Sequence, residues 1–298
     1  MRVFVTGATG LIGRALCRSL LEGGHSVLAL SRRAAPQGLP AGAEPVQGDP
    51  AAPGRWQEAL AGCDACLNLA GEPVAAGRWT RARKQAIRDS RVLATRNVAA
   101  VVAERGPAVL VNASAIGYYG PRGDEALDES APPGSDFLSR TCVEWEGAAA
   151  PAAKRARVVL ARTGLVLARE GGALPRMALP FKLFAGGPIG DGSFWQSWVH
   201  LADEVGLLAW ALREERLAGP LNATAPAPVR NRDLARALGR ALHRPSFLPA
   251  PALAVRVLIG EMAEVAVTGQ RVLPARALDL GYRFRYSEVE AALRDLFP

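Results

Sequence analysis

The sequence predicts an α/β fold in which helices cover both faces of a doubly wound parallel sheet. An apolar run at residues 3–5 leads into glycines at positions 7, 10 and 13, and an amphipathic segment follows them. A second apolar run spans residues 27–30. Strand, glycine turn, helix and strand in this order make a βαβ unit, and the alternation continues along the chain. This order is typical of Rossmann dinucleotide-binding domains.

The remaining elements follow at short intervals. Further strands are expected at residues 44–46, 64–69, 108–113 and 156–161, and near 220–224, where the chain returns to the main sheet. Long helices are expected at residues 80–104 and 135–153. We therefore divide the chain into a nucleotide-binding Rossmann domain, residues 1–165 with the returning strand, and a substrate or cap region, residues 166–298. The end of the cap region is expected to be small and mostly helical.

The glycines of the first turn predict a nucleotide site. Gly7 can make the sharp turn, Gly10 can let the backbone approach a pyrophosphate, and Gly13 can let the helix pack on the strand. The helix N-terminus also presents free N–H groups and the positive end of its dipole to phosphates. The residues of this loop that we expect at the cofactor are Gly7, Thr9, Gly10, Leu11, Ile12 and Gly13.

The end of the second strand indicates NADP(H) as the cofactor. NAD-binding members of this fold place an acid there for the ribose 2′-hydroxyl, whereas this chain has Ser31, Arg32 and Arg33. A hydroxyl and two guanidiniums suit a 2′-phosphate, although two arginines after a strand can also be solvated surface. Asp49 after the third strand could reach the adenine amino group. The small residues after the fourth strand, where the ribose and diphosphate could lie against the backbone, are Leu69, Ala70 and Gly71.

Composition narrows the class of protein. The chain has 298 residues, and no apolar stretch reaches the roughly 18 residues of a membrane span. The first strand follows Met1-Arg2 directly, so we expect a cytoplasmic protein with no membrane partner. The net charge of +8 comes from scattered arginines, which argues against nucleic acid. We interpret the four cysteines as buried free thiols, and we expect no metal site. The substrate and the oligomeric state stay open.

Several motifs together carry a family resemblance. They are VTGATGLIG from residue 5, NLAGEP from 68, SAIGYYG from 114, DFLSRTCVEWE from 136, RTGLVL from 162, SWVH from 197 and GQRVLP from 269. With these the chain resembles the short-chain dehydrogenase/reductase superfamily, in its NAD-dependent epimerase/dehydratase-like branch. It is most similar to the atypical epimerase family proteins, whose C-terminal piece, here about residues 248–296, is a domain of unknown function. The resemblance implies an NADPH-binding Rossmann domain, a small substrate domain and a poorly defined reaction.

Two further cofactor contacts follow from this resemblance. Arg91 lies in a Ser-Arg motif on the long helix that flanks the site, and Val166 follows the sixth strand. We expect Arg91 to contact the cofactor and the Val166 backbone to lie near its nicotinamide end.

The parent superfamily uses a tyrosine as acid/base, a lysine four residues later and a serine on the loop after the fifth strand. The serine position falls on Ala115 when Tyr119 is matched to the usual tyrosine of that loop. Three registers place the tyrosine and the lysine at Leu138 and Cys142, at Phe137 and Thr141, or at Asp136 and Arg140. Because no register restores the pair, hydride chemistry by the usual triad is not expected.

Other side chains could substitute if the protein is a catalyst. Tyr118 and Tyr119, on the loop after the fifth strand, and Ser114 are the candidates, although aromatic residues there often only pack. His200 reads as a structural residue at a strand-to-helix joint, with Asp203 as the helix-cap partner. The residues expected to line a pocket wall or lid are Met177, Phe181, Phe184 and Trp195.

Two classes of function stay open. The first is an NADP(H)-dependent oxidoreductase or nucleotide-sugar epimerase-like enzyme acting on an unknown small molecule. The second is a non-catalytic regulator or sensor that uses NADPH occupancy to set the shape of its helical cap. The missing pair of tyrosine and lysine favours the second class, and the expected apolar pocket favours the first.

Overall fold

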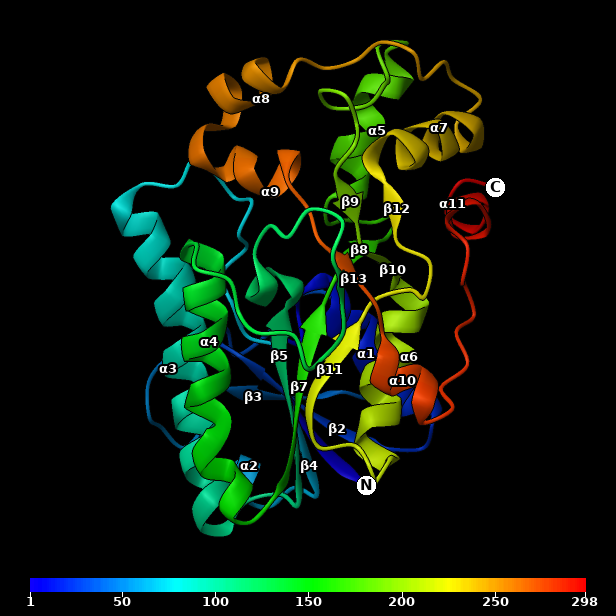
Figure 1. Ribbon diagram of the computed structural model, residues 1–298. Coiled ribbons are helices and arrows are strands. Elements are labelled where there is room, and N and C mark those ends of the chain that lie inside the picture. The colour runs from blue at the N-terminus through cyan, green and yellow to red at the C-terminus, as the bar shows by residue number, and fades with distance from the viewer.

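The structure is a computed structural model built around a parallel sheet of seven strands (Figure 1). It describes the backbone of residues 1–298 and all side chains except those at positions 252, 256, 258, 259, 265 and 266. The strands are β1 (Arg2–Thr6), β2 (Ser26–Ser31), β3 (Glu44–Gln47), β4 (Ala65–Asn68), β5 (Val109–Ala115), β7 (Arg157–Thr163) and β11 (Gly219–Ala223). Their spatial order is β11-β7-β5-β4-β1-β2-β3, so the predicted Rossmann fold is confirmed. The order reverses between β1 and β4, which is where such sheets bind ligands.

Helices cover both faces of this sheet, as predicted. Figure 1 shows α1 (Leu11–Glu22) beside α6 (Leu201–Arg213) on one face, and α3 (Arg81–Arg105) beside α4 (Phe137–Ala149) on the other, with α2 (Trp56–Ala61) below them. In β1, Val3 and Val5 join the core under α1 and α6, whereas Phe4 joins the core under α2 and α3. A strand buried on both faces has to be apolar throughout, which is why β1 reads as a continuous apolar run.

Polar side chains determine where the two long helices begin. Thr80 accepts a hydrogen bond from the backbone N–H of Arg83 (3.1 Å), and Asp136 accepts one from Ser139 (2.8 Å). Each side chain is an N-cap, so both helices start one or two residues later than predicted. The second also ends earlier than predicted, because a 3₁₀ helix, η2 (Ala150–Lys154), replaces its last turn and contains Pro151.

Short strands and helices, most of them in the cap region, lie outside the main sheet. Two-stranded sheets pair β8 (Leu165–Leu167) with β10 (Trp198–His200), β9 (Trp195–Gln196) with β12 (Val229–Arg230), and β6 (Ala126–Leu127) with β13 (Arg271–Val272). The α-helices are α5 (Leu174–Lys182), α7 (Asn231–Ala241), α8 (Ala252–Ile259), α9 (Ala263–Val267), α10 (Ala275–Asp279) and α11 (Val289–Leu296). Two further 3₁₀ helices are η1 (Ile116–Tyr119) and η3 (Gly260–Met262). The C-terminal region is therefore helical, as expected.

The expectation of a pocket wall or lid is wrong for Phe181. Phe181 is only 4% exposed and packs in a core shared with α7 and α11, and Met177 packs against the same core. Phe184 is 64% exposed beneath the Arg244 guanidinium, so it faces away from that core. Trp195 is half-buried and donates from its indole nitrogen to Asp124 (2.7 Å). The apolar face of α5 is used to cover the cap core, which spacing along the chain does not reveal.

His200 takes the structural place expected for it, but with different partners. Its Nδ1 accepts the backbone N–H of Ala202 (3.1 Å), so His200 itself caps α6. The expected cap residue, Asp203, instead accepts the backbone N–H groups of Arg285 and Tyr286 (2.7 and 2.9 Å). These two hydrogen bonds hold the segment before α11 against the start of α6.

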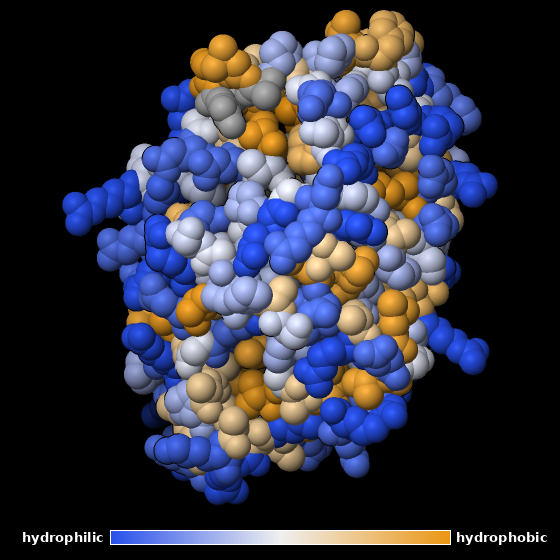
Figure 2. All heavy atoms as spheres, viewed as in Figure 1, coloured by the Kyte–Doolittle hydropathy of each residue, from blue (hydrophilic) through white to orange (hydrophobic). Residues whose placement is uncertain are grey.

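Hydrophilic side chains cover most of the face seen in Figure 2. Hydrophobic side chains gather over α8 and near the end of α5, where Leu253, Val257, Leu183 and Phe184 are exposed. Among the helices that the structure describes, none combines the length and the apolar character needed to cross a bilayer.

Candidate functional site

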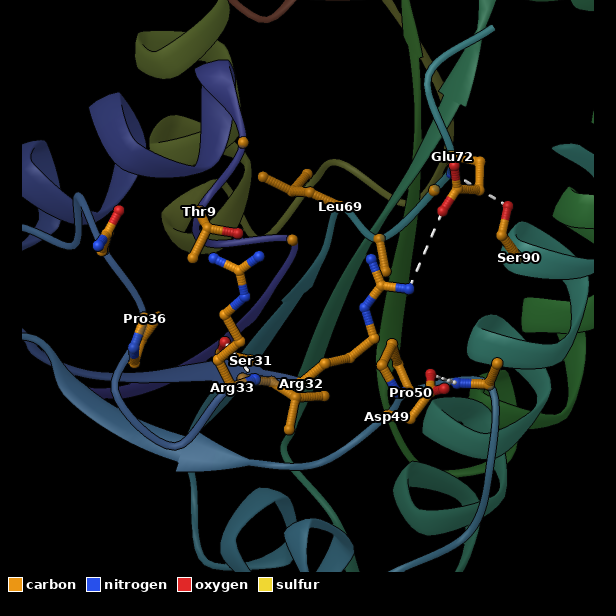
Figure 3. A pocket seen from close by; sticks show the side chains of 17 residues that line it. Thr9, Ser31, Arg32, Arg33, Pro36, Asp49, Pro50, Leu69, Glu72 and Ser90 are labelled. Atoms are coloured by element: carbon orange, nitrogen blue, oxygen red, sulfur yellow. Dashed lines mark hydrogen bonds and ion pairs between the residues drawn. The ribbon is translucent and has the colours of Figure 1, made fainter. Parts of the chain in front are cut away.

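A cavity of about 620 Å³ opens at the carboxyl ends of β1, β2 and β4, next to the point where the strand order reverses. Its volume falls in the range of small-molecule and cofactor sites. The predicted residues that line it are Gly7, Thr9, Gly10, Ser31, Arg32, Arg33, Asp49, Leu69, Ala70 and Gly71. Segments that are far apart in the sequence thus form one pocket, seen in Figure 3.

The glycine turn has no room for side chains at two positions. Gly7 has φ +66°, and a Cβ there would lie 2.6 Å from the carbonyl oxygen of Leu69. A Cβ on Gly13 would lie 2.2 Å from the carbonyl oxygen of Gly7, so α1 packs directly on the turn. A Cβ on Gly10 would meet only that same oxygen, at 3.2 Å. Gly7 and Gly13 are therefore required by the protein itself, whereas Gly10 leaves the pocket side of the turn open.

Buried polar side chains fix the wall of the pocket that the loop after β4 forms. Thr6 donates from its hydroxyl to Asn68 (2.6 Å) and accepts the backbone N–H groups of Leu69 and Ala70 (3.0 and 3.1 Å). Asn68 in turn donates to Asn112 (2.6 Å). These side chains are fully buried, and their bonds tie the ends of β1, β4 and β5 together. The loop after β4 is thereby fixed at the cavity.

Basic side chains occupy the other end of the pocket, after β2. In Figure 3, Arg32 extends toward Glu72 and Arg33 toward Thr9. Ser31 accepts the backbone N–H of Arg33 (3.1 Å), which shapes this turn. Asp49, just after the neighbouring strand β3, accepts the backbone N–H of Ala51 (2.9 Å) with one carboxylate oxygen.

Seven lining residues were not predicted. They are Leu30, Pro36, Gln37, Pro50, Ala51, Glu72 and Ser90. Most directly adjoin predicted residues, so a wider window around each motif would have included them. Ser90 comes from α3 and precedes the predicted Arg91, and Glu72 follows the predicted Gly71. Their side chains become part of the pocket only because α3 packs beside the end of β4.

Five residues predicted at the cofactor do not line this cavity: Leu11, Ile12, Gly13, Arg91 and Val166. The Arg91 guanidinium lies behind Gly71, where a Cβ would come within 3.1 Å of its Cζ. It donates to the carbonyl oxygens of Glu72 (3.0 Å) and Ile87 (2.9 Å), so it supports the pocket wall. Val166 pairs with Val199 between β8 and β10. A cofactor contact by these five residues stays a prediction.

The candidate catalytic side chains belong to a buried ionic network. Arg162 makes two hydrogen bonds to the Glu146 carboxylate (2.8 and 2.9 Å), and Ser114 donates to the same carboxylate (2.6 Å). Arg162 also donates to the hydroxyl of Tyr119 (2.9 Å), which itself donates to Asn222 (2.7 Å). Ser114 and Tyr119 are therefore committed to interactions inside the protein.

The two tyrosines differ in their surroundings. Tyr119 is fully buried, and this burial raises the pKa of its hydroxyl to about 12 despite the nearby Arg162 charge. Tyr118 is half-buried, and the Arg162 guanidinium lies 3.5 Å from the centre of its ring. The pKa of Arg162 is raised, because the hydrogen bonds and charge of Glu146 outweigh the burial that alone would lower it. Tyr118 is thus a partly buried residue whose ring packs on a cation held by Glu146.

The first turns of α4 pack against the loop after β5. A Cβ built on Gly117, in the loop after β5, would lie 3.4 Å from Leu138 and 3.9 Å from the sulfur of Cys142. Leu138 and Cys142, one helical turn apart, therefore lie beside this loop, and Ser139 between them donates from its hydroxyl to the carbonyl oxygen of Gly117 (3.0 Å). Burial, with a smaller effect of the Glu146 charge, raises the pKa of the Cys142 thiol to about 12, so it is protonated near neutral pH.

All four cysteines are buried and free. The described side chains contain no cluster of three potential metal ligands.

Two sequence families match this chain. Residues 3–222 match the NAD dependent epimerase/dehydratase family, and residues 250–296 match a domain of unknown function, DUF1731. The epimerase family protein SDR39U1 homolog, chloroplastic, of Arabidopsis thaliana is 44% identical over 99% of this chain and 86% of its own length. The epimerase family protein Mb2239 of Mycobacterium bovis is 43% identical over 98% of this chain and 96% of its own length.

Solved structures show the same similarity. Human epimerase family protein SDR39U1, crystallised with NADPH, superposes with a TM-score of 0.89 at 34% identity, covering 99% of each chain. The nucleoside-diphosphate sugar epimerase of Corynebacterium glutamicum superposes with a TM-score of 0.80 at 36% identity, covering all of this chain and 58% of its own.

Proposed function

Because this chain belongs to the NAD dependent epimerase/dehydratase family, we propose that it binds NADP(H) in the cavity between the glycine turn and the end of β4. The observation that carries this proposal is the position of Arg32 and Arg33, which extend into the pocket across from the glycine turn. The NADPH bound to human SDR39U1, a relative along nearly the whole chain, supports it.

The residues present fit such a cofactor. The open side of the turn at Gly10 and the first N–H groups of α1 would hold the pyrophosphate, as in other Rossmann sites. Ser31, Arg32 and Arg33 would hold the 2′-phosphate, and Leu69 to Gly71 would carry the ribose. NADP(H), when bound, supplies or accepts a hydride.

Replacing Arg32 by alanine is expected to weaken NADPH binding about ten- to a hundredfold while hardly changing NADH binding. A charge-assisted contact to the 2′-phosphate is worth roughly 1.5–3 kcal/mol, and NADH lacks that phosphate. Fluorescence titration with both dinucleotides measures the effect. Arg105→Ala removes an exposed arginine at the far end of α3 and serves as control. Equal losses for the two dinucleotides would show that Arg32 does not read the phosphate.

We further propose an oxidoreductase or nucleotide-sugar epimerase-like reaction on a small molecule, without the usual pair of tyrosine and lysine. In the register that places this pair at Leu138 and Cys142, the two residues whose side chains lie closest to Gly117, neither side chain transfers a proton at neutral pH. Tyr118 is the best remaining acid/base candidate, because Tyr119 and Ser114 are held in buried hydrogen bonds. Arg162, lying against the ring of Tyr118, would position it.

Tyr118→Phe is expected to reduce turnover about 10²- to 10⁴-fold, the usual contribution of a positioned general acid or base, with NADPH affinity unchanged. The variant removes a hydroxyl and keeps the ring on Arg162. Tyr119→Phe is the matched control: it should retain turnover but lose about 1–3 kcal/mol of stability, because buried partners of its hydroxyl are left unsatisfied. If both variants retain full turnover, the proton comes from water or from the substrate.

A non-catalytic regulator is the second candidate, and the apolar pair Leu138 and Cys142 beside the loop after β5 favours it. Purified protein loaded with NADPH, screened against carbonyl compounds and nucleotide sugars, separates the two. Oxidation of NADPH or an epimerised sugar supports the enzyme. No turnover across a broad library, together with an NADPH-dependent change in proteolysis of the cap, supports the regulator. A reducing, cytoplasmic compartment suits either function, since all four thiols are free.

A further inference from the structure

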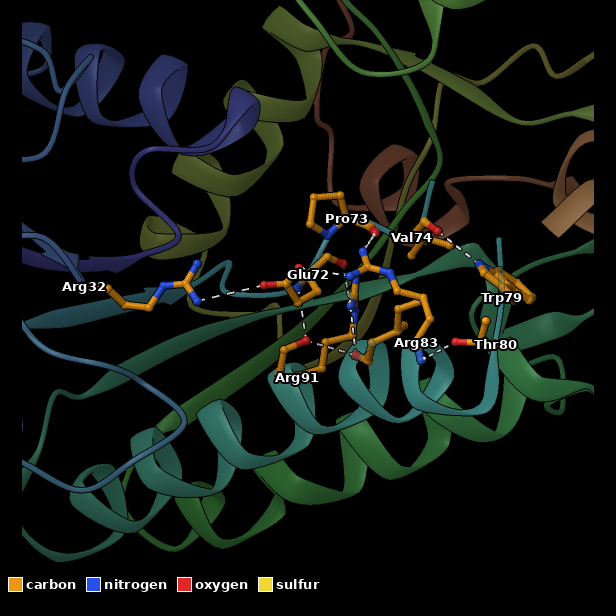
Figure 4. Close-up of polar contacts among 10 residues, drawn as sticks. Arg32, Glu72, Pro73, Val74, Trp79, Thr80, Arg83 and Arg91 are labelled. Atoms are coloured by element: carbon orange, nitrogen blue, oxygen red, sulfur yellow. Dashed lines mark hydrogen bonds and ion pairs between the residues drawn. The ribbon is translucent and has the colours of Figure 1, made fainter. Parts of the chain in front are cut away.

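Three arginines converge on one glutamate at the rim of the cavity (Figure 4). Arg83 donates from Nη1 to Oε2 of Glu72 (3.3 Å), and Arg91 donates to its carbonyl oxygen (3.0 Å). Arg32 approaches from the opposite wall, with its Nη1 4.0 Å from Oε1 of Glu72. Glu72 is thus the carboxylate nearest to the arginine proposed to read the 2′-phosphate.

Side chains of α3 hold Glu72 in place. Its backbone N–H donates to the hydroxyl of Ser90 (3.0 Å), which donates to the carbonyl oxygen of Ile87 (3.1 Å). Arg83 also donates to the carbonyl oxygen of Pro73, next along the chain. With its backbone and one carboxylate oxygen held, Glu72 has little freedom to move away from the pocket.

The contact with Arg32 is of a different kind. At 4.0 Å it is an ion pair without a hydrogen bond, and the side chain of Arg32 is 73% exposed. Arg32 is therefore free to turn toward another anion, whereas Glu72 is not. A phosphate that binds Arg32 in the orientation seen here would share its guanidinium with the Glu72 carboxylate, 4.0 Å from Nη1. That charge opposes a dianionic phosphate more than a neutral hydroxyl at the same place.

We propose that Glu72 is a selectivity residue that limits the preference of this pocket for a 2′-phosphorylated dinucleotide. Arg32 attracts the phosphate, and Glu72 both competes for Arg32 and repels the phosphate. Arg83, paired with Glu72 at 3.3 Å, and Arg91 reduce the repulsion between Glu72 and a phosphate. Both arginines are present with and without the Glu72 charge, so removing that charge still makes the site more favourable for a phosphate. The inference rests on the proposed binding of NADP(H).

The test compares wild-type protein, Glu72→Gln, Arg32→Ala and the double variant in titrations with NADPH and NADH at fixed ionic strength. Glu72→Gln keeps the shape and removes the charge. We expect it to bind NADPH about three- to tenfold more tightly and NADH less than about twofold more tightly, the size of effect of a half-exposed ion pair. In the Arg32→Ala background the gain should shrink, since the competition for Arg32 is gone. Glu290→Gln, which removes an exposed carboxylate paired with Arg240 on the cap, should change neither affinity.

Several results of these titrations would overturn the inference about Glu72. Unchanged or weaker NADPH binding by Glu72→Gln would overturn the inference, and weaker binding of both dinucleotides would show that Glu72 contacts the cofactor directly. A gain of the same size for NADPH and NADH would also overturn it, because the effect would not depend on the 2′-phosphate. If the wild-type protein itself does not bind NADPH, the proposed function fails, whatever the variant does.

Discussion

Gly10→Val is expected to abolish NADPH binding, with a loss of at least about a hundredfold in affinity, while the protein stays folded. Gly10 has φ −75° and ψ 175°, a conformation that valine adopts readily, and a Cβ there meets only the carbonyl oxygen of Gly7 at 3.2 Å. The added side chain therefore stands on the pocket side of the turn, where the pyrophosphate is proposed to approach the backbone. Titration calorimetry gives the affinity, and circular dichroism shows whether the fold is retained.

Two other glycines are matched controls for this change. A Cβ on Gly147, in α4, meets nothing within 4 Å, so Gly147→Val should leave both fold and affinity intact. Gly13→Val should instead unfold the protein, because its Cβ would lie 2.2 Å from the carbonyl oxygen of Gly7. Wild-type affinity in Gly10→Val would place the cofactor elsewhere.

Arg162→Met is expected to lower the free energy of unfolding by about 3–5 kcal/mol, the usual cost of removing one partner of a buried ion pair. Arg162 is 3% exposed and Glu146 9%, so the carboxylate would be left buried without its cation. The hydroxyl of Tyr119 would lose a hydrogen-bond donor as well. Urea denaturation followed by circular dichroism measures the shift in midpoint.

The double variant Arg162→Met/Glu146→Leu should recover much of this loss, because replacing both ions by apolar side chains leaves no unpaired charge. A surface pair provides the comparison: Arg216, 65% exposed, contacts Glu214 at 2.7 Å, and Arg216→Met should shift the midpoint of urea denaturation much less than Arg162→Met does. If Arg162→Met costs no more than Arg216→Met, the network does not stabilise the fold. It would then have to be explained by a role at the site.

Local patterns were sufficient for the sheet and for one wall of the pocket. The inner strands of this sheet are buried on both faces, so they could be predicted from apolar runs, whereas the edge strand β3 is mostly exposed. The glycine turn could be predicted because Gly7 and Gly13 have no room for a side chain. Both residues lie within a single βαβ unit. Arg32 and Arg33 were found because their place, just after β2, is determined by the same unit.

Local sequence patterns did not predict the contacts between side chains from distant segments. Glu72 meets Arg32 and Arg83 only when the ends of β2 and β4 and the start of α3 come together. The same holds for Ser114, Glu146 and Arg162, which come from β5, α4 and β7. Which residues of α4 lie beside the loop after β5 depends on the rotation of that helix, so the sequence alone did not show that Leu138, Ser139 and Cys142 are the residues found there.

The sequence by itself determined the Rossmann fold, the glycine turn and the basic end of the pocket, because these depend on burial period and backbone sterics within a few tens of residues. Only the tertiary structure decided that Tyr119 and Ser114 are held in a buried ionic network, that Phe181 fills the cap core, and that a fixed carboxylate faces Arg32. Such facts depend on which side chains meet across the fold, and spacing along one chain does not encode the rotation and packing that bring them together.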